Sequence, residues 1–259
     1  MRRVSELLDV AILAATRVSD TLSGFFEGPA RNVDSKSTPT DLVSDADRAA
    51  EKFLIDFFRH ERPDDGILAE EGGGRESRSG LTWVIDPLDG TVNFLFGIPV
   101  WCVSIAVQDA DGGVAGVVYD PNRDELFAAA RGEGATLNGE PIHVSDKKEL
   151  AAALIGTGFS YDAEARSEQA AILSRVLPKV RDVRRAGSAA IDLATLACGR
   201  FDGFYEAPME AWDKAAGVLI VQEAGGIVTE LPAPKHLSPG VVAAGPALHD
   251  ALRALVLAE

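Results

Sequence analysis

Two carboxylates and a hydroxyl follow directly after an apolar run in the first half of the chain. The run Leu81–Ile85 leads into Asp86-Pro87-Leu88-Asp89-Gly90-Thr91, so these groups would stand at the mouth of a buried strand. Carboxylate and hydroxyl oxygens are the ligands that hard divalent cations prefer. Asp, Pro and Gly are also common turn residues, and a plain turn is the alternative. Because a turn accounts for the backbone but not for the paired acids, the hexapeptide predicts a metal site.

Four more acids stand at the ends of predicted elements. Glu70 closes one short predicted strand and Glu206 closes another. The carboxyl ends of strands are where the ligand sites of layered α/β proteins collect. Asp213 opens a predicted helix, whose N-terminus favours anions. Asp47 stands three residues after Ser44, the predicted N-cap of a further helix.

Several of these acids also have a purely structural interpretation. Asp47 could complete a capping box with Ser44. Glu70 could be a solvated strand end, and Asp213 could be an ordinary acid of a helix N-terminus. Their meeting in space would decide between the interpretations.

A meeting of four acids would require cations. If they lay within ~5 Å of one another, each pair would repel by ~3 kcal/mol at an effective dielectric constant near ~20. The four acids are Glu70, Asp86, Asp89 and Asp213. Such a cluster would be a two- or three-metal site, which suits in-line phosphoryl transfer to water.

Other catalytic chemistries lack their motifs. The chain has no P-loop run Gly-x-x-x-x-Gly-Lys-Ser/Thr and no Gly-x-Ser-x-Gly elbow. The spacing of Asp86 and Asp89 fits neither an EF-hand nor an Asp-x-Asp aspartyl-phosphate enzyme. All four histidines fall in predicted loops or surface-like stretches, where a lone histidine is normally solvated. They are His60, His143, His236 and His249. Neither a Ser–His nor a Cys–His nucleophile is therefore supported.

The composition is that of an acidic globular protein. Of the 259 residues, 46% are hydrophobic and 25% are charged, and the formal net charge is −15. We expect no nucleic-acid and no membrane partner, because nucleic acids and anionic membranes both need a basic surface. Cys102 and Cys198 lie inside apolar runs and predict buried free thiols in a reducing compartment.

The N-terminal segment predicts a helix of the folded domain. Apolar residues recur at helical spacing between Val4 and Leu22, which indicates an amphipathic helix rather than a signal peptide. No apolar run approaches the roughly 18 residues that a membrane span needs. These features predict a cytoplasmic protein.

A change of pattern near residue 150 predicts two halves. Before it, strands at 100–108, 114–119 and 125–130 follow two helices and should pair antiparallel, with Asn138-Gly139 as a hairpin turn. After it, strands at 154–157 and 204–207 alternate with helices at 163–177, 188–198, 212–224 and 246–258. Residues 1–150 would form an α+β half that carries most of the metal ligands. Residues 151–259 would form an α/β half that completes the site within one compact unit.

Two signatures resemble those of the magnesium-dependent inositol monophosphatases. Asp-Pro-[Ile/Leu]-Asp-Gly-Thr, preceded by a strand with Trp-x-Ile, matches residues 83–91, and Trp-Asp-x-Ala-[Ala/Ser]-Gly matches residues 212–217. Supporting matches lie at 36–47, 70–71, 187–193 and 199–206, so the resemblance covers nearly the whole chain. It implies an αβαβα sandwich of the sugar-phosphatase type, Mg²⁺ as the cofactor and a homodimer.

The resemblance assigns metal ligands residue by residue. Glu70, Asp86 and the backbone carbonyl of Leu88 would hold a first Mg²⁺. Asp86, Asp89 and Asp213 would hold a second. Glu70 with water molecules would hold a third, weaker ion, which gives two to three ions per site.

The resemblance also assigns catalytic and phosphate contacts. A water near Glu70 and Thr91 would attack phosphorus, and Thr91 and Asp47 would take part in its deprotonation. Gly90 and Thr91 would offer backbone N–H groups to the phosphate. Lys36 would lie near the phosphate and the third ion.

The contacts to the alcohol come mainly from the second half. Glu206 would accept hydrogen bonds from substrate hydroxyls. The remaining residues implied to touch substrate are Asp89, Gly187, Ser188, Ala189 and Asp213. This set describes a pocket for a small phosphorylated polyol or sugar.

Some positions depart from the family pattern. Ala211 stands where many bacterial relatives have proline, and Phe96 stands where relatives often have histidine. Both departures spare the metal ligands and concern the pocket for the alcohol. Arg184 and Arg185 could line a more anionic pocket, as in relatives that hydrolyse bisphosphates. The alternative is a pair of surface arginines on a strand edge.

The predicted activity is Mg²⁺-dependent hydrolysis of a phosphoric monoester, with inositol 1-phosphate as the first substrate. Histidinol phosphate, fructose 1,6-bisphosphate and a 3′-phosphonucleotide are alternatives on the same site. The segment Gly187-Ser188-Ala189-Ala190 favours the inositol type over the histidinol type. A non-catalytic regulatory binding protein on this scaffold would have lost a ligand or Thr91, and none of the predicted catalytic acids or Thr91 is missing.

Overall fold

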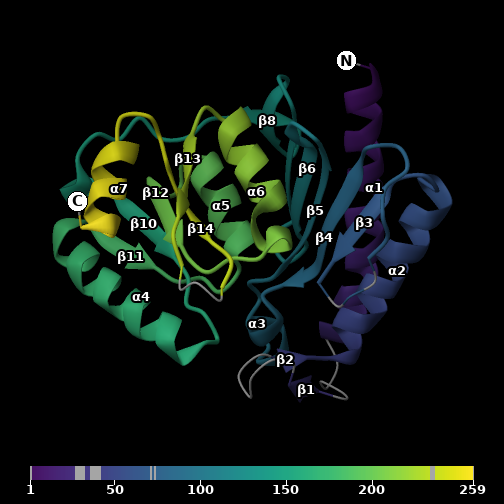
Figure 1. Ribbon diagram of the computed structural model, residues 1–259, viewed down its shortest axis with the longest axis horizontal. Helices are drawn as coiled ribbons and strands as arrows, with labels where there is room; N and C mark the ends of the chain where they lie inside the picture. Colours follow the sequence, from purple (N-terminus) through teal and green to yellow (C-terminus); the bar gives the residue numbers. More distant parts are fainter. Residues whose placement is uncertain are drawn as a thin grey trace.

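Helices and sheets alternate through five layers in the computed structural model (Figure 1). The layers are a pair of helices, a seven-stranded sheet, a second pair of helices, a five-stranded sheet and a third pair of helices. The structure describes residues 2–26, 33–35, 42–70, 72, 74–233 and 237–258, so the predicted contact Lys36 lies outside the described residues, as does His236. The predicted αβαβα sandwich is confirmed.

The first helical layer covers one face of the larger sheet. Helix α1 (Arg2–Phe26) contacts β5, β6 and β7, and α2 (Asp45–Glu61) lies beside it and contacts β3 and β4. The side chains that α1 buries recur every three or four residues, as an apolar helix face requires. They include Leu7, Ala11, Ala14, Val18 and Leu22. The predicted N-terminal amphipathic helix is therefore confirmed.

The larger sheet has the strand order β3-β4-β5-β6-β7-β8-β9, which follows the chain. Only β3 and β4 pair parallel, and the other neighbours are antiparallel. The strands are β3 (Gly66–Ala69), β4 (Thr82–Asp89), β5 (Cys102–Asp109), β6 (Gly112–Asp120), β7 (Glu125–Ala130), β8 (Gly134–Leu137) and β9 (Glu140–Ile142). The predicted antiparallel strands are confirmed. So is the hairpin, where Asn138 and Gly139 adopt φ of 51° and 83° between β8 and β9.

The middle layer packs tightly between the two sheets. Helices α5 (Ala189–Ala197) and α6 (Ala211–Glu223) run side by side there (Figure 1). A Cβ atom on Gly116 of β6 would lie 3.1 Å from Cα of Ala216, and one on Gly217 would lie 2.7 Å from the side chain of Leu193. These close approaches fix α6 against both the sheet and α5, and with it the acid at its first turn.

The smaller sheet is mixed, with the strand order β11-β10-β12-β14-β13. Strand β10 pairs parallel with β11 and β12, whereas β14 pairs antiparallel with β12 and β13. The strands are β10 (Leu154–Thr157), β11 (Asp182–Arg184), β12 (Gly203–Glu206), β13 (Ile227–Leu231) and β14 (Gly240–Ala244). Helices α4 (Ala163–Val176) and α7 (His249–Leu257) form the outer layer.

Short elements complete the described fold. Helix α3 (Thr91–Leu95) follows β4 directly. The strands β1 (Asp34–Ser35) and β2 (Leu42–Val43) pair with each other. Two 3₁₀ turns span Leu150–Ala152 and Leu177–Lys179. None of the helices built from the described residues is long and apolar enough to cross a membrane.

The structure differs from the sequence prediction in four respects. Strands β13 and β14 were not predicted, and for β14 the reason is that a five-residue, wholly buried run gives no periodicity to distinguish strand from helix. The last helix begins at His249 rather than at residue 246. The expectation of a solvated His249 is wrong, because the imidazole is 2% exposed and lies 3.0 Å from the Thr229 hydroxyl of β13. Cys102 is buried as predicted, whereas Cys198 is only partly buried, and both are free.

Candidate active site

One cavity of about 500 Å³ gathers the predicted site residues from both sheets. It lies where β4 ends and where α3, α5 and α6 begin. The predicted residues that line it are Glu70, Asp86, Leu88, Asp89, Gly90, Thr91, Gly187, Ser188, Ala189, Glu206 and Asp213. Among the described residues, Asp47 is the one predicted site residue that does not line it, and it reaches the cavity through Thr91.

The end of β4 is bent so that its two acids reach the cavity. The pairing of β4 with β5 shifts register between Asp86 and Asp89, where Pro87 supplies no backbone donor. The N–H of Leu88 instead donates to Oδ1 of Asp86, at 3.1 Å. The hexapeptide is therefore both a strand irregularity and the place where two carboxyl groups enter one cavity.

The four acids whose meeting the sequence left as a condition all line this cavity. They are Glu70, Asp86, Asp89 and Asp213. Burial is the main reason why the pKa of Asp86 lies well above its usual range. The charges of Glu70, Asp89 and Asp213 raise that pKa further, and a hydrogen bond links the carboxyl groups of Asp86 and Glu70. Repulsion of this kind is what carboxylates experience when they share a site without a cation.

The donor set fits a hard divalent cation in its chemistry. Carboxylate and carbonyl oxygens, at high local negative charge, are what such ions prefer. Within the described residues, no group of three or more His, Cys, Asp or Glu side chains has the geometry that holds a metal ion. The fit therefore lies in the ligand types and the charge of the cavity.

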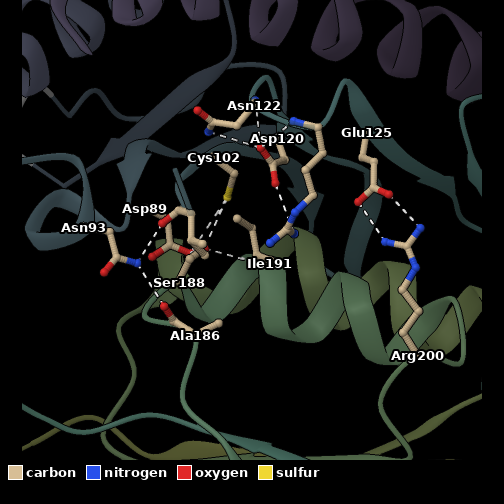
Figure 2. A network of polar contacts seen from close by, with 12 residues as sticks. Asp89, Asn93, Cys102, Asp120, Asn122, Glu125, Ala186, Ser188, Ile191 and Arg200 are labelled. Atoms are coloured by element: carbon tan, nitrogen blue, oxygen red, sulfur yellow. Dashed lines mark hydrogen bonds and ion pairs between the residues drawn. The ribbon is translucent and has the colours of Figure 1, made fainter. Parts of the chain in front are cut away.

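Asp89 joins the two halves of the molecule. Its Oδ2 accepts a hydrogen bond of 2.6 Å from the Ser188 hydroxyl and one of 2.7 Å from the N–H of Ala190, at the first turn of α5 (Figure 2). Ser188 is also the N-cap of α5, since its hydroxyl accepts from the N–H of Ile191 at 3.2 Å. Burial raises the pKa of Asp89, and these donors counteract the rise. The Sγ of Cys102 lies 3.5 Å from the Ser188 hydroxyl.

Asp213 is fixed by the start of its own helix. The N–H of Glu210 donates to Oδ2 of Asp213 at 2.7 Å, which completes a capping box at α6. Burial and the charge of Asp89 raise the pKa of Asp213 well above its usual range, while this hydrogen bond lowers it. Asp213 is therefore an acid of a helix N-terminus, as the structural interpretation predicts. It also lines the cavity.

Asp47 likewise makes both of the contacts that the sequence analysis considered, one with Ser44 and one with Thr91. Its Oδ2 accepts from the backbone N–H and the hydroxyl of Ser44, at 2.9 and 2.6 Å, as a capping box predicts. Its Oδ1 accepts a hydrogen bond of 2.8 Å from the Thr91 hydroxyl, which also lies 3.1 Å from the carbonyl of Leu88. The cap thus leaves one carboxylate oxygen for Thr91, and the three side chains are almost fully buried.

Two glycines shape the cavity wall by conformation. Gly90 has φ of 100°, and a Cβ atom there would lie 2.9 Å from the carbonyl of Val100. Gly187 has φ of 102°, and its Cβ atom would lie 2.6 Å from the amide nitrogen of Asn93. That nitrogen donates to the carbonyls of Val100 and Ala186, at 2.8 and 2.9 Å, and so ties α3 to the loop before α5 (Figure 2).

Glu206 lines the cavity from the end of β12. Its carboxyl group lies over Gly158, where a Cβ atom would come within 2.1 Å of it. Burial, reinforced by the charges of Asp192 and Asp89, raises the pKa of Glu206 to about 8, although Arg185 lowers it. A carboxyl group in these surroundings can both donate and accept hydrogen bonds near neutral pH.

The two arginines of the sequence have different positions. Arg184 is exposed and pairs with Asp182 at 2.6 Å, as a strand-edge arginine would. Arg185 lines the cavity. Arg185 lies one residue beyond the end of β11 and is also exposed to solvent, so it borders the cavity without being buried in it.

The sequence prediction missed three acids on the cavity wall, which are Asp162, Asp192 and Glu210. Asp192 lies in the first turn of α5, four residues after Ser188, and is 2% exposed. An i, i+4 spacing from the N-cap places it on the same helix face as Ser188. That spacing was visible in the sequence, but an acid in a first helical turn is common for other reasons.

Comparisons with known proteins agree with this geometry. The fold and the acidic cavity together define a phosphoric monoester hydrolase of the sugar-phosphatase type. The sequence profile described as "Inositol monophosphatase family" matches residues 3–258, and the chain belongs to that family. The family is generally metal-dependent.

Individual relatives cover most of the chain. The inositol-1-monophosphatase of Mycobacterium leprae is 45% identical over 234 residues, which are 86% of this chain and 80% of that protein. The Nus factor SuhB of Escherichia coli is 39% identical over 252 residues, 96% of this chain and 94% of that one. The crystal structure of the extragenic suppressor protein suhB from Bartonella henselae has a TM-score of 0.89 at 37% identity, over 97% of this chain and 98% of that one.

Proposed function

We propose that this protein hydrolyses a small phosphorylated polyol with the help of Mg²⁺, and that inositol 1-phosphate is its first substrate. The observation that carries the proposal is one cavity lined by four acids, by Thr91 with its Asp47 partner, and by Glu206 with the start of α5. We define the phosphate subsite as the four acids and Thr91. Its residues are Glu70, Asp86, Asp89, Thr91 and Asp213. The alcohol subsite consists of Gly187, Ser188, Ala189 and Glu206.

Two to three Mg²⁺ ions would be held by the phosphate subsite. Glu70, Asp86, Asp89 and Asp213 would contribute carboxylates, and Leu88 its carbonyl, which has a second lone pair beside the Thr91 contact. When bound, the ions would neutralise phosphate charge and make a water molecule more acidic. The raised pKa values of Asp86 and Asp213 support this, because a cation would restore the charged forms that burial disfavours.

Thr91 and Asp47 would move the proton of the attacking water. Oδ2 of Asp47 is occupied by Ser44, so Oδ1 faces the Thr91 hydroxyl and can take its proton. Oγ1 of Thr91 can then receive the proton of a water in the cavity. Gly90 and Thr91 would direct backbone N–H groups at the phosphate, for which the left-handed turn at Gly90 leaves room.

The alcohol subsite would bind the leaving alcohol. Glu206 would bond its hydroxyls, while Gly187, Ser188 and Ala189 would border its ring. Asp89 and Asp213 would contact the same substrate from the phosphate side. Arg185 on the cavity wall is a specific reason to keep fructose 1,6-bisphosphate as a second candidate, because a guanidinium group would favour a second phosphate.

The family also suggests how the chain is organised. We infer a cytoplasmic homodimer in which residues 1–150 and 151–259 act as one unit. Light scattering behind size-exclusion chromatography would test the dimer. The Escherichia coli relative is named a Nus factor. The net charge of −15 disfavours nucleic acid as a partner, and we propose none.

Phosphate release from purified, chelator-treated protein tests the proposal. The panel comprises inositol 1-phosphate, histidinol phosphate, fructose 1,6-bisphosphate and a 3′-phosphonucleotide, each titrated with Mg²⁺. We expect activity only with added Mg²⁺ and the highest kcat/KM with inositol 1-phosphate. Metal-independent turnover would overturn the metal assignment, and equal turnover across the panel would overturn the assignment of the alcohol.

A further inference from the structure

The side-chain amide of Asn93 connects the two halves of the molecule beside the cavity. Asn93 belongs to α3, two residues after Thr91, and is 6% exposed. Its Nδ2 donates to the carbonyl of Val100 at 2.8 Å and to the carbonyl of Ala186 at 2.9 Å (Figure 2). Because Ala186 is 93 residues further along the chain, one amide group joins the start of α3 to the loop before α5.

Both carbonyls that accept from Asn93 stand beside a glycine of the cavity wall. The carbonyl of Val100 would lie 2.9 Å from a Cβ atom on Gly90, the N-cap of α3. Ala186 directly precedes Gly187, and a Cβ atom on Gly187 would lie 2.6 Å from Nδ2 and 3.0 Å from Oδ1 of Asn93. The amide therefore packs against the alcohol subsite, and through Val100 it supports the turn that leads into the phosphate subsite.

A primary amide meets the needs of this place better than other side chains. Its NH₂ group has two N–H donors, and Asn93 uses them on two different carbonyls. A serine or threonine would offer one donor, and an ionised aspartate would offer none. Asn93 is not among the described residues that line the cavity, so its influence on a reaction there would act through the residues that it holds.

The two neighbours of Gly187 are each bonded to the first half of the chain. Ala186, before it, accepts from Asn93, and Ser188, after it, donates to Asp89 at 2.6 Å. Ser188 also caps α5. Loss of the Asn93 bonds would therefore release Gly187 on one side, while α5 would keep its cap and its bond to Asp89.

We propose that Asn93 is a positioning residue that sets the spacing between the phosphate subsite and the alcohol subsite. The proposal rests on the proposed function and deepens it, since it names the group that aligns a substrate spanning both subsites. A displacement of about 1 Å can lower a rate by about a hundredfold when a substrate must be held in one geometry. A ligand that occupies the phosphate subsite alone does not depend on this spacing.

Three probes separate a change of spacing from a general loss of structure. Inositol 1-phosphate would span both subsites. 4-Nitrophenyl phosphate has no hydroxyl for Glu206 to bind, and inorganic phosphate, as a competitive inhibitor, would fill the phosphate subsite alone. The quantities to measure are kcat/KM for the two esters and the inhibition constant of phosphate, all at saturating Mg²⁺.

The test variants are Asn93→Ala and Asn93→Ser. Asn93→Ala removes both hydrogen bonds, and we expect kcat/KM for inositol 1-phosphate to fall about thirtyfold or more. The value for 4-nitrophenyl phosphate should change less than about threefold, and the inhibition constant of phosphate less than about twofold. Asn93→Ser keeps one donor, so its loss with inositol 1-phosphate should be smaller, about fivefold, and it provides the test if Asn93→Ala does not fold.

Asn138→Gly is the matched control. The amide of Asn138 also makes two hydrogen bonds, from Nδ2 to the carbonyl of Asp124 and to Oδ1 from the N–H of Leu126, both at 2.8 Å. It lies in the hairpin between β8 and β9 and does not line the cavity. Glycine tolerates the φ of 51° at this position. We expect a lower melting temperature for Asn138→Gly, with an unchanged ratio of the two kcat/KM values.

The outcomes separate the two levels of inference. A selective loss with inositol 1-phosphate in the Asn93 variants alone supports the spacing role. If the wild-type protein hydrolyses both esters and the Asn93 variants leave their ratio unchanged, the spacing role is overturned and the proposed function stands. A shift of the ratio in Asn138→Gly as large as that in Asn93→Ala would also overturn the role, because the ratio would then follow stability. If the wild-type protein releases phosphate from neither ester, the proposed function fails, and the role of Asn93 fails with it.

Discussion

In the phosphate subsite, hydrogen bonds already hold the carboxyl groups before any ligand arrives. Asp89 accepts from two donors at the start of α5, and Asp213 accepts from the start of α6. Asp47, which lies behind Thr91 of this subsite, accepts three hydrogen bonds. On the wall next to the alcohol subsite, Oδ1 of Asp192 has no donor among the described residues. The comparison indicates that hydrogen bonds within the protein fix the carboxyl groups of Asp47, Asp89 and Asp213, whereas one oxygen of Asp192 has none among the described residues.

The largest effect should come from the acid that links both halves. In Asp89→Asn the amide oxygen can keep the hydrogen bonds from Ser188 and Ala190, but the charge is lost. We expect kcat to fall by about a thousandfold or more, because a metal ligand is weakened, with little change in thermal unfolding. Turnover at saturating Mg²⁺ and the melting temperature are the two measurements. Near-normal turnover would remove Asp89 from the metal site.

The next effect should come from the proton path. Thr91→Val keeps the shape of the side chain and removes the hydroxyl that faces Asp47. We expect kcat to fall by about a hundredfold with KM little changed, as loss of a proton-transfer group predicts. Ser44→Ala is the matched control, because it should cost about 1 kcal/mol of stability at the helix cap with a much smaller loss of kcat. Equal losses of kcat in the two variants would contradict the proton path.

A smaller effect is expected in the alcohol subsite. Glu206→Ala removes an acceptor for substrate hydroxyls but touches no predicted metal ligand. We expect KM for inositol 1-phosphate to rise about tenfold while the Mg²⁺ concentration for half-maximal activity stays unchanged. Kinetics on the phosphate-ester panel measure both. If substrate preference were unaltered, Glu206 would not belong to the pocket.

The last prediction concerns how the free energy of unfolding depends on pH. The pKa of Glu206 is about 8 in the folded protein, above the ordinary value of 4.5. Between these values the folded state binds more protons than the unfolded state, so stability falls as pH rises from about 4.5 to about 8. Glu206→Gln should remove that part of the slope, on the order of a few kcal/mol, since each pKa unit corresponds to about 1.4 kcal/mol.

Urea unfolding in the presence of a chelator, at pH 5 and at pH 8.5, gives the slope for both proteins. The difference between the two slopes isolates Glu206, because Asp86, Asp192 and Asp213 also have raised pKa values and contribute with the same sign. Identical slopes would show that Glu206 titrates at its ordinary pKa.

How far the sequence predicts this molecule depends on the kind of signal. The Asp86–Thr91 hexapeptide and the helical spacing of α1 are local patterns, and both lie where the sequence placed them. Strand β14 was missed because Gly240–Ala244 is short and wholly buried, so it has no polar alternation. His249 was misjudged because its burial depends on a contact with β13 that no local pattern encodes.

The site residues show the same limit. For Asp47 the sequence offered a helix cap or a partner of Thr91 as alternatives, and the structure has both contacts because a carboxylate has two oxygens. The convergence of Glu70 with Asp86 could be stated only as a condition, since it depends on how β3 and β4 lie in the sheet. Asp192 was missed because its spacing from Ser188 is visible in the sequence, but an acid in a first helical turn is common for other reasons.

The shared use of Asp47 couples a motion to the reaction. The carboxylate that closes the first turn of α2 is the one that faces Thr91, so fraying of that turn would also displace the proposed proton acceptor. Conversely, a phosphate held against Thr91 would oppose the fraying. Amide hydrogen exchange in the first turn of α2 should therefore slow when inorganic phosphate and Mg²⁺ are added, although the rest of that helix packs on the outer face of the sheet.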